Sequence, residues 1–264
     1  MLKQRVLTVL IAAPFLIASL LTSHTIAFKL VVIFCIAAGL WEFFSLIQLP
    51  KNEKLYGMVL GLTHLLFILF CPHFLEKSLL EISGILILVL AYFCFCPGQI
   101  EGAIGRIASL FLGILYIGTF GGLIGLIRDW ENGLFWMSFL MATVWMNDTT
   151  AYFTGRAFGK HKLAPKVSPG KSIEGFVGGM VGSWLGFFIF WFIFHQPIDV
   201  KHGLILATII AIVGPIGDLS ESLLKRSVGA KDSGTMIPGH GGMLDRIDAL
   251  LFAAPIVYFL AQNY

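Results

Sequence analysis

Between Arg106 and Arg128 the chain reads Ile107-Ala-Ser-Leu-Phe-Leu-Gly-Ile-Leu-Tyr-Ile-Gly-Thr-Phe-Gly-Gly-Leu-Ile-Gly-Leu-Ile127, without one charged residue. A membrane-spanning helix needs about 20 consecutive apolar residues, and this stretch has that length. Eight further apolar runs lie at about 6–23, 30–49, 55–75, 79–97, 133–148, 174–195, 203–220 and 247–262. The sequence therefore predicts an all-α fold, a polytopic integral membrane protein with about nine transmembrane helices.

The composition supports this class and excludes several others. Only 12% of the 264 residues are charged and 57% are hydrophobic, whereas a soluble domain has about 25% charged residues. Nine helices use about 180 residues, which leaves no room for a separate soluble domain. We divide the chain into N-terminal transmembrane helices (1–130, about five spans) and a C-terminal transmembrane half (131–264), in which we expect the functional loops. A net charge of +3 without a basic stripe gives no reason to expect a nucleic-acid partner.

The distribution of lysine and arginine predicts the orientation. With nine spans, the N-terminus and the even-numbered loops together carry 14 of these bases, and the odd-numbered loops carry 4. Cytoplasmic loops of membrane proteins carry the excess of positive charge. The N-terminus is therefore expected in the cytoplasm and the C-terminus outside.

Two predicted cytoplasmic loops, 147–174 and 218–248, concentrate the polar residues. They hold nine of the 18 bases and seven of the 15 acids. Ionisable residues are costly in a membrane, so such a concentration marks the expected functional site. Glu42 is an exception, because it lies within an apolar run, and we expect it to bond within the helix bundle.

The loop 218–248 combines acids with bases. Asp218, Ser222 and Lys225 share one helix face by their spacing, and Asp245 and Asp248 share another. Oxygen ligands of this kind suit Mg²⁺, which usually takes one or two carboxylates together with substrate phosphates. Four bases would then bind phosphate oxygens, namely Lys225, Arg226, Lys231 and Arg246. This combination points to phosphoryl or nucleotidyl transfer.

Simpler interpretations exist for single residues. Glu221 and Lys225 could form a surface ion pair at i, i+4, and Asp245 could cap a helix. In the loop 147–174, Gly170-Lys171-Ser172 resembles part of a P-loop, but Pro165 stands where that motif needs glycine. We reject the P-loop, and we expect Asp148 to join the metal cluster.

A longer pattern runs through the second loop: Ser222-x-Leu-Lys-Arg-x-x-x-x-Lys-Asp-x-Gly-x-x-Ile-Pro-x-His-Gly-Gly-Met-x-Asp-Arg-Ile-Asp248. It resembles the signature of the phosphatidate cytidylyltransferase (CDP-diacylglycerol synthase) family over 27 positions. The first loop resembles that family's second block, in the runs Asp148-Thr-x-Ala-Tyr-Phe-x-Gly-Arg156 and Ser168-Pro-x-Lys-Ser-x-Glu-Gly175. Ser172, where threonine is commoner, is a conservative departure.

The resemblance implies that CTP and phosphatidate react to give CDP-diacylglycerol and pyrophosphate for phospholipid synthesis, with Mg²⁺ as cofactor. It places metal ligation on Asp218 and Asp245, with Asp248 close by as a third candidate, and phosphate binding on Ser222, Lys225 and Arg226. It does not divide Lys231, His240 and Arg246 between CTP and the lipid phosphate, and His240 could equally hold the turn. Further expected substrate-binding residues are Asp148, Arg156, Lys166, Ser168 and Lys171.

The expected location is a bacterial-type inner membrane, with the active site facing the cytoplasm. There the phosphate of phosphatidate meets CTP, in a polar cleft open to the cytosol and sideways to lipid. Two alternatives stay open: transfer to another lipid, such as a polyprenol or an ether lipid, and an ion-coupled transporter. The sequence leaves the oligomeric state open, a homodimer included.

Overall fold

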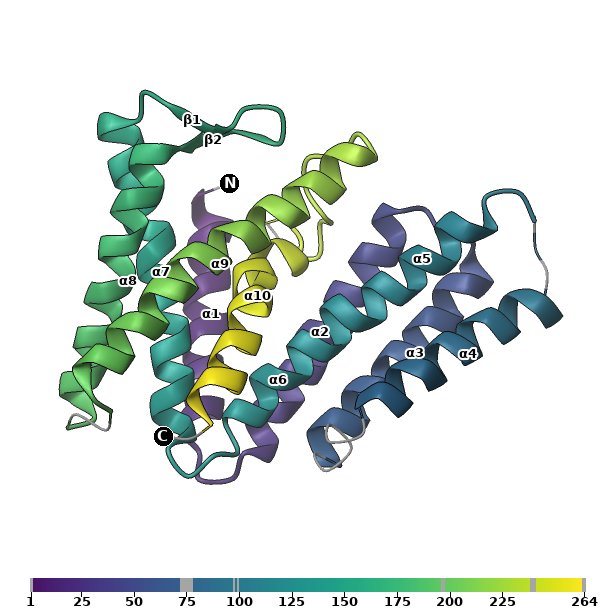
Figure 1. Ribbon diagram of the computed structural model, residues 1–264, viewed down its shortest axis with the longest axis horizontal. Coiled ribbons are helices and arrows are strands. Elements are labelled where there is room, and N and C mark those ends of the chain that lie inside the picture. Colours follow the sequence, from purple (N-terminus) through teal and green to yellow (C-terminus); the bar gives the residue numbers. More distant parts are fainter. Residues whose placement is uncertain are drawn as a thin grey trace. The chain divides into compact units, whose positions relative to one another are not determined.

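The computed structural model describes residues 2–71, 78–96, 98, 100–195, 198–237 and 241–262. In that part of the chain nearly all regular structure is helical (Figure 1). The elements are α1 (Leu2–Leu21), α2 (Ile26–Leu46), α3 (Lys51–Phe70), α4 (Ser78–Phe95), α5 (Ala103–Gly113), the π-helical stretch η2 (Ile114–Thr119), α6 (Phe120–Ile127), α7 (Gly133–Phe158), β1 (Lys162–Ala164), β2 (Ser168–Ser172), α8 (Ile173–Ile193), α9 (Val200–Ser227) and α10 (Leu244–Ala261).

The architecture is that of a helical integral membrane protein. Each predicted apolar run overlaps one of these helices, and the run 107–127 overlaps α5, η2 and α6 together. Five helical segments of the described chain are long and apolar enough to cross a membrane. They are Ile26–Leu46, Lys51–Phe70, Ala103–Ile127, Ile173–Ile193 and Val200–Ser227.

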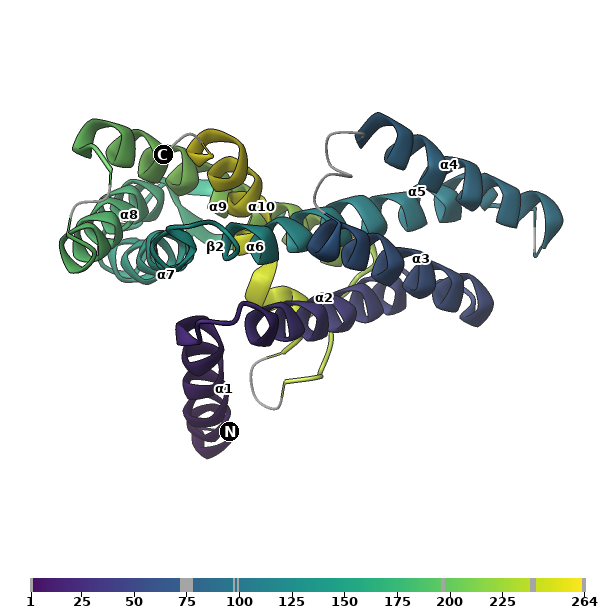
Figure 2. The same cartoon turned by 90° about the horizontal axis from the view of Figure 1, so that it is seen from below.

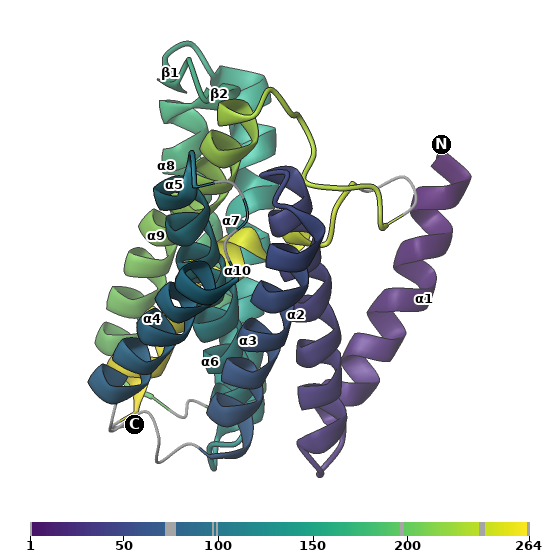
Figure 3. The same cartoon turned by 90° about the vertical axis from the view of Figure 1, so that its right-hand side faces the viewer.

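The chain forms two compact units. Unit 1 comprises Met1–Leu126 and Asp232–Leu244, and unit 2 comprises Ile127–Lys231 and Asp245–Tyr264. In unit 1, α2 and α3 lie side by side (Figure 3), and both contact η2. Their shared core includes Phe43, Phe44, Leu65 and Ile114, all fully buried. Between helices in a membrane, such side chains stabilise the unit by van der Waals packing, since lipid tails are as apolar as they are.

Unit 2 is built on α7 and α8, which lie side by side in two views (Figures 1 and 2). Glycines of α8 allow this approach, because small residues let the backbones of two helices come close. A Cβ atom at Gly182 would lie 2.4 Å from the Met146 carbonyl oxygen, and one at Gly186 would lie 2.7 Å from that of Ala142. Larger residues here would push the two helices apart.

The predicted loop 147–174 differs from the observed structure, because α7 continues to Phe158. The hydroxyl groups of Thr149 and Thr150 donate to the carbonyl oxygens of Trp145 and Met146, both at 2.7 Å. These bonds satisfy polar side chains within the helix, so the polar sequence does not end it. The rest of the segment is the antiparallel hairpin β1–β2, in which Lys162 pairs with Ser172.

The hairpin is held at its base by two side chains. Glu174 accepts hydrogen bonds from the backbone N–H groups of Lys160 and His161 and contacts His161 Nδ1 at 2.7 Å. Ser172 caps α8, since its hydroxyl accepts a hydrogen bond from the N–H of Gly175 at 3.1 Å. The strand that carries Ser168 and Lys171 is thereby attached to the start of α8.

Candidate functional site

The sequence predicts helix at both ends of the segment 218–248, and the structure has helix at both ends. Helix α9 continues to Ser227, and α10 begins at Leu244, so Asp245 lies in its first turn. Lys225 and Arg226 occupy the last turn of α9, where positive charge is favoured by the helix dipole. The acids at the start of one helix and the bases at the end of the other are therefore fixed in regular structure.

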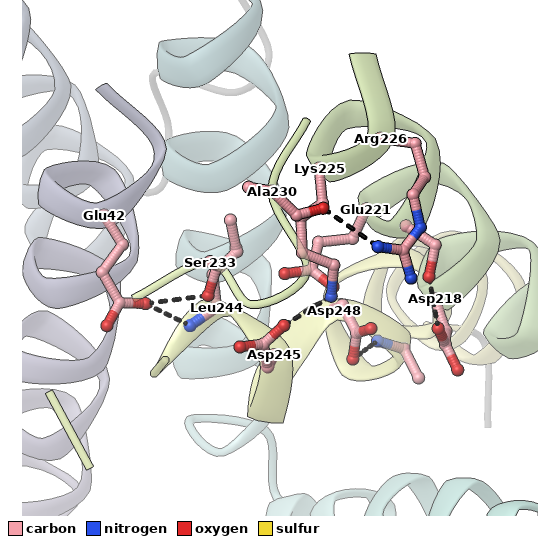
Figure 4. A network of polar contacts seen from close by, with 12 residues as sticks. Glu42, Asp218, Glu221, Lys225, Arg226, Ala230, Ser233, Leu244, Asp245 and Asp248 are labelled. Carbon is pink, nitrogen blue, oxygen red and sulfur yellow. Dashed lines mark hydrogen bonds and ion pairs between the residues drawn. The ribbon is translucent and has the colours of Figure 1, made fainter. Parts of the chain in front are cut away.

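One face of α9 carries polar side chains that are almost completely buried. Glu221 is 1% exposed, Ser222 9% and Lys225 8%. The Ser222 hydroxyl donates to Oδ1 of Asp218 at 3.3 Å, one turn earlier (Figure 4). Asp218, Ser222 and Lys225 share a face as the spacing predicts, and that face points into the protein.

Lys225 joins two carboxylates. Its Nζ lies 2.5 Å from Oε2 of Glu221 and 2.5 Å from Oδ1 of Asp245 (Figure 4). The alternative of a surface Glu221–Lys225 ion pair is wrong, because both groups are buried and the lysine also bonds to another helix. A buried lysine held by two carboxylates has a fixed position, unlike a solvated one.

A second set of carboxylates lies around Asp218. Asp148 on α7 and Asp248 on α10 are both within electrostatic range of Asp218. Lys171 on β2 offsets part of this negative charge, with its Nζ 2.6 Å from Oδ2 of Asp218. Asp248 is 8% exposed, and its Oδ1 accepts a hydrogen bond from the N–H of Ala249 at 2.8 Å.

We call this set the carboxylate cluster: Asp148, Asp218, Glu221, Asp245 and Asp248. Four elements of unit 2 contribute to it or to its lysines, namely α7, β2, α9 and α10. Within the described residues, two lysines bond to it directly, Lys171 and Lys225. These ion pairs reach three of the five acids, Asp218, Glu221 and Asp245, so in this part of the chain the carboxylates exceed the lysines bonded to them. Neighbouring negative charges repel one another unless another cation approaches.

The other predicted residues surround the cluster at varying distance. Arg226 is exposed and donates to the Ala230 carbonyl at 3.0 Å, with the Val167 carbonyl at 3.5 Å. Because Val167 precedes Ser168, Arg226 lies beside the hairpin that carries Ser168. Ser168 itself is half-buried. Arg156 contacts the Tyr152 hydroxyl on its own helix at 3.3 Å. Lys166, Lys231 and Arg246 are exposed, and His240 lies outside the described residues.

Sequence reasoning missed Glu221 as a member of the site. It counted Glu221 among the acids of the loop and named it otherwise only in the alternative of a surface ion pair, although its place between Asp218 and Lys225 on the same helix was a usable signal. Its Oε2 bonds to Lys225, while its Oε1 is buried without a hydrogen-bond partner in the described residues. Buried carboxylate oxygens usually have a donor or a cation as partner, and the described residues supply none to this one.

The cluster suits a divalent cation by its chemistry. Its ligand atoms are all oxygens, the preference of Mg²⁺, and carboxylates exceed ammonium groups. In the described residues no three acidic, histidine or cysteine side chains form a ready-made metal cage. Mg²⁺ usually binds through one or two carboxylates and completes its shell with phosphates and water, so such a cage is not needed.

Comparison with known proteins agrees with this chemistry. The family model of the cytidylyltransferase family matches residues 3–264. A protein of Bacillus subtilis named phosphatidate cytidylyltransferase is 33% identical over 98% of this chain and 97% of its own length. Proteins of the same name from Pseudomonas aeruginosa and Thermotoga maritima are 37% and 33% identical, each over at least 95% of both chains.

Proposed function

The chain belongs to the cytidylyltransferase family, and we propose that it transfers the cytidylyl group of CTP to phosphatidate. The products are CDP-diacylglycerol, a precursor of phospholipids, and pyrophosphate. The observation that supports this site is the carboxylate cluster, in which five acids from three helices, Glu221 and Asp248 among them buried, outnumber the lysines bonded to them within the described residues. Such a cluster is suited to a polyphosphate that arrives with its own cation.

The chemistry needs charge neutralisation more than proton transfer. The phosphate monoester of phosphatidate has a second pKa near 6, so it is largely a dianion at neutral pH. Its oxygen attacks the α-phosphorus of CTP, the bond from that phosphorus to the β-phosphate oxygen breaks, and pyrophosphate leaves. No general base is required, because the nucleophile is already ionised. The difficulty lies in bringing two anions together in line.

Four polar side chains of unit 2 suit that task. The ammonium group of Lys225 is bonded to Asp245, and that of Lys171 is bonded to Asp218. We assign them, with Ser222 and Arg226, to the phosphates of CTP and of the lipid. When substrate binds, each lysine can exchange a carboxylate for a phosphate oxygen, a charge-assisted bond of the same type. Arg226 can grip a phosphate with two parallel N–H donors.

Asp218 and Asp245, with Asp248 close by, are the residues that would hold Mg²⁺. Bound by these residues, Mg²⁺ would neutralise charge on the triphosphate and would favour the in-line arrangement. Asp148 and Glu221 add negative charge around these ligands and increase the attraction for a cation. Lys166, Ser168, Lys231, Arg246, Arg156 and His240 remain proposed contacts to substrate.

We also propose the membrane arrangement that the sequence indicates. Nine helices would cross the inner membrane with the N-terminus in the cytoplasm, which puts 14 of the 18 bases on the cytoplasmic side. The cluster would then lie at the cytoplasmic interface, where the phosphate of phosphatidate and soluble CTP can meet. A reporter fused after Tyr264 is expected outside the cell, and a cytoplasmic signal would contradict the nine-span arrangement.

The test of the reaction uses protein purified in detergent, CTP labelled at the α-phosphate, and mixed micelles of phosphatidate. The label should appear in CDP-diacylglycerol, and unlabelled pyrophosphate should form in an equal amount. Chelation of Mg²⁺ should stop the formation of both products. Parallel arms contain a polyprenyl phosphate or an ether-linked lipid phosphate. If one of these lipids gives a cytidylylated product and phosphatidate gives none, that lipid replaces phosphatidate as the proposed acceptor. If no arm releases pyrophosphate, the proposed reaction is refuted.

A further inference from the structure

Glu42 is a buried acid outside the carboxylate cluster. It lies in α2, a helix apolar enough to cross a membrane, and it is 4% exposed. A carboxylate in such a helix is costly, and it persists where it bonds to specific partners. Its partners within unit 1 come from the segment Asp232–Leu244, which precedes the first acid of α10.

One oxygen of Glu42 binds both ends of that segment. Its Oε2 accepts a hydrogen bond from the Ser233 hydroxyl at 3.2 Å and another from the backbone N–H of Leu244 at 2.9 Å (Figure 4). These partners are separated from Glu42 by about 200 residues of sequence. Ser233 and Leu244 therefore bond to the same oxygen of one carboxylate.

Two glycines allow the segment to approach so closely. A Cβ atom at Gly234 would lie 2.6 Å from Oε1 of Glu42, and one at Gly242 would lie 2.5 Å from Oε2. At Gly234 the three nearest atoms to such a Cβ all belong to Glu42. Real Cβ atoms do not come this near to an oxygen, so the packing depends on glycine at both positions.

The bond to Leu244 has a particular consequence. Leu244 is the first residue of α10, and the first N–H groups of a helix have no acceptor within that helix. A carboxylate at a helix N-terminus satisfies such a donor and is also favoured by the helix dipole. Glu42 therefore fixes the point at which α10 begins, and Asp245 follows one residue later.

We propose that Glu42 is a positioning residue for cytidylyl transfer: it sets the start of α10 and thereby the place of Asp245. This inference rests on the proposed function, since Asp245 is one of the residues assigned to the metal and the phosphates. Glu42 itself touches no substrate in this account. It acts through the backbone of Leu244 and the ends of the signature segment.

The test compares Glu42→Ala with Glu42→Gln in the purified enzyme. Alanine removes the acceptor, and misplacement of a catalytic group by about 1 Å can cost on the order of 100-fold in rate. We expect kcat per folded enzyme to fall by roughly that factor, with a much smaller change in the KM for CTP. Glutamine keeps a carbonyl acceptor, so the kcat of Glu42→Gln should stay within about threefold of that of the original enzyme.

Glu53→Ala is the matched control, because Glu53 is also a buried acid of unit 1, 5% exposed, but bonds to Arg106 on α5. It should leave kcat per folded enzyme near normal. An undiminished kcat in Glu42→Ala, or a Glu42→Gln enzyme as slow as Glu42→Ala, would overturn the inference. If the original enzyme forms no CDP-diacylglycerol, the proposed function is overturned instead. Failure of the inference and failure of the proposed function can therefore be distinguished.

Gly234→Ala is a second route if Glu42→Ala does not fold. The added methyl group meets the Glu42 carboxylate and should displace the segment, lowering kcat by about tenfold or more. Gly84→Ala on α4 is its control, because a Cβ atom there meets nothing within 4 Å. Equal kcat in the two glycine variants would contradict the proposal.

Discussion

Buried acids occur in both units, but their surroundings differ. In unit 1, Glu53 bonds to Arg106 at 3.0 Å, and Glu81 bonds to His64 Nδ1 at 2.7 Å, whose Nε2 bonds to Thr119 at 2.8 Å. Each of these two acids has its own basic partner. In unit 2, five carboxylates share two bonded lysines within the described residues.

The difference separates a structural role from a binding role. An acid matched by one base and hydrogen-bonded to it crosslinks helices and presents no excess charge to a ligand. A group of acids that exceeds its bases stores electrostatic repulsion, which a cation and its phosphates relieve. A group of several acids that exceeds the bases bonded to it, and not burial alone, indicates where substrate binds. Glu42 is a single buried acid held by hydrogen bonds to Ser233 and Leu244, and it does not form such a group.

The largest expected effect comes from Asp218→Asn. It keeps the shape of the side chain but removes the charge that faces Lys171, Asp148 and Asp248. Turnover of CTP should fall on the order of 10³-fold or more, because a preorganised electrostatic contact to the reacting phosphates is lost. Steady-state assays of pyrophosphate release measure it. Substantial activity in a folded Asp218→Asn enzyme would remove this residue from the site.

Lys225→Met should affect both activity and stability. It leaves Glu221 and Asp245 without the ammonium group between them, and breaking a buried pair on one side costs about 3–5 kcal/mol. Thermal unfolding in detergent should show the loss of stability, and kcat should fall about 100-fold.

The companion variant Glu221→Gln/Lys225→Met separates the two effects. Removing the uncompensated charge of Glu221 should recover part of the stability but none of the activity. Recovery of activity in the double variant would show that Lys225 serves only to neutralise Glu221.

Lys171→Gln should have an intermediate effect. Its ammonium group pairs with Asp218 from the hairpin and is 25% exposed, so its removal changes the charge presented to CTP more than the fold. The KM for CTP should rise about tenfold, with a smaller decrease in kcat. Lys162→Gln, an exposed cation of the same hairpin, is the control. Equal kinetics in the two variants would exclude a specific role for Lys171.

The smallest effect on activity is expected from His64→Leu in unit 1. It leaves Glu81 and Thr119 without a histidine partner, which should destabilise the protein by about 1–3 kcal/mol. The activity per folded enzyme should stay within about twofold of normal. Thermal unfolding and turnover measured on the same sample test this separation. A large loss of kcat without loss of stability would contradict the comparison between the units.

Much of this could be predicted from the sequence. Charge-free runs locate the helices because hydrophobic length is a local property, and the spacing of Asp218, Ser222 and Lys225 predicts a common face. The extension of α7 to Phe158 could not be predicted, because it depends on threonine hydroxyls that bond back to their own helix. The bond between Glu221 and Lys225 is local, but the bond from Lys225 to Asp245 joins residues 20 positions apart. The partners of Glu42 lie about 200 positions away, and a local pattern does not contain such contacts.

The most direct measurement of the central claim is the kcat for CDP-diacylglycerol formation in Asp245→Asn and in Glu53→Gln, assayed side by side. Each variant neutralises one buried acid that bonds to a base, one in the carboxylate cluster and one in a matched pair. We predict that Asp245→Asn lowers kcat on the order of 10³-fold, while Glu53→Gln stays within about threefold of the original enzyme. Similar kcat values in the two folded variants would contradict the assignment of the carboxylate cluster as the active site.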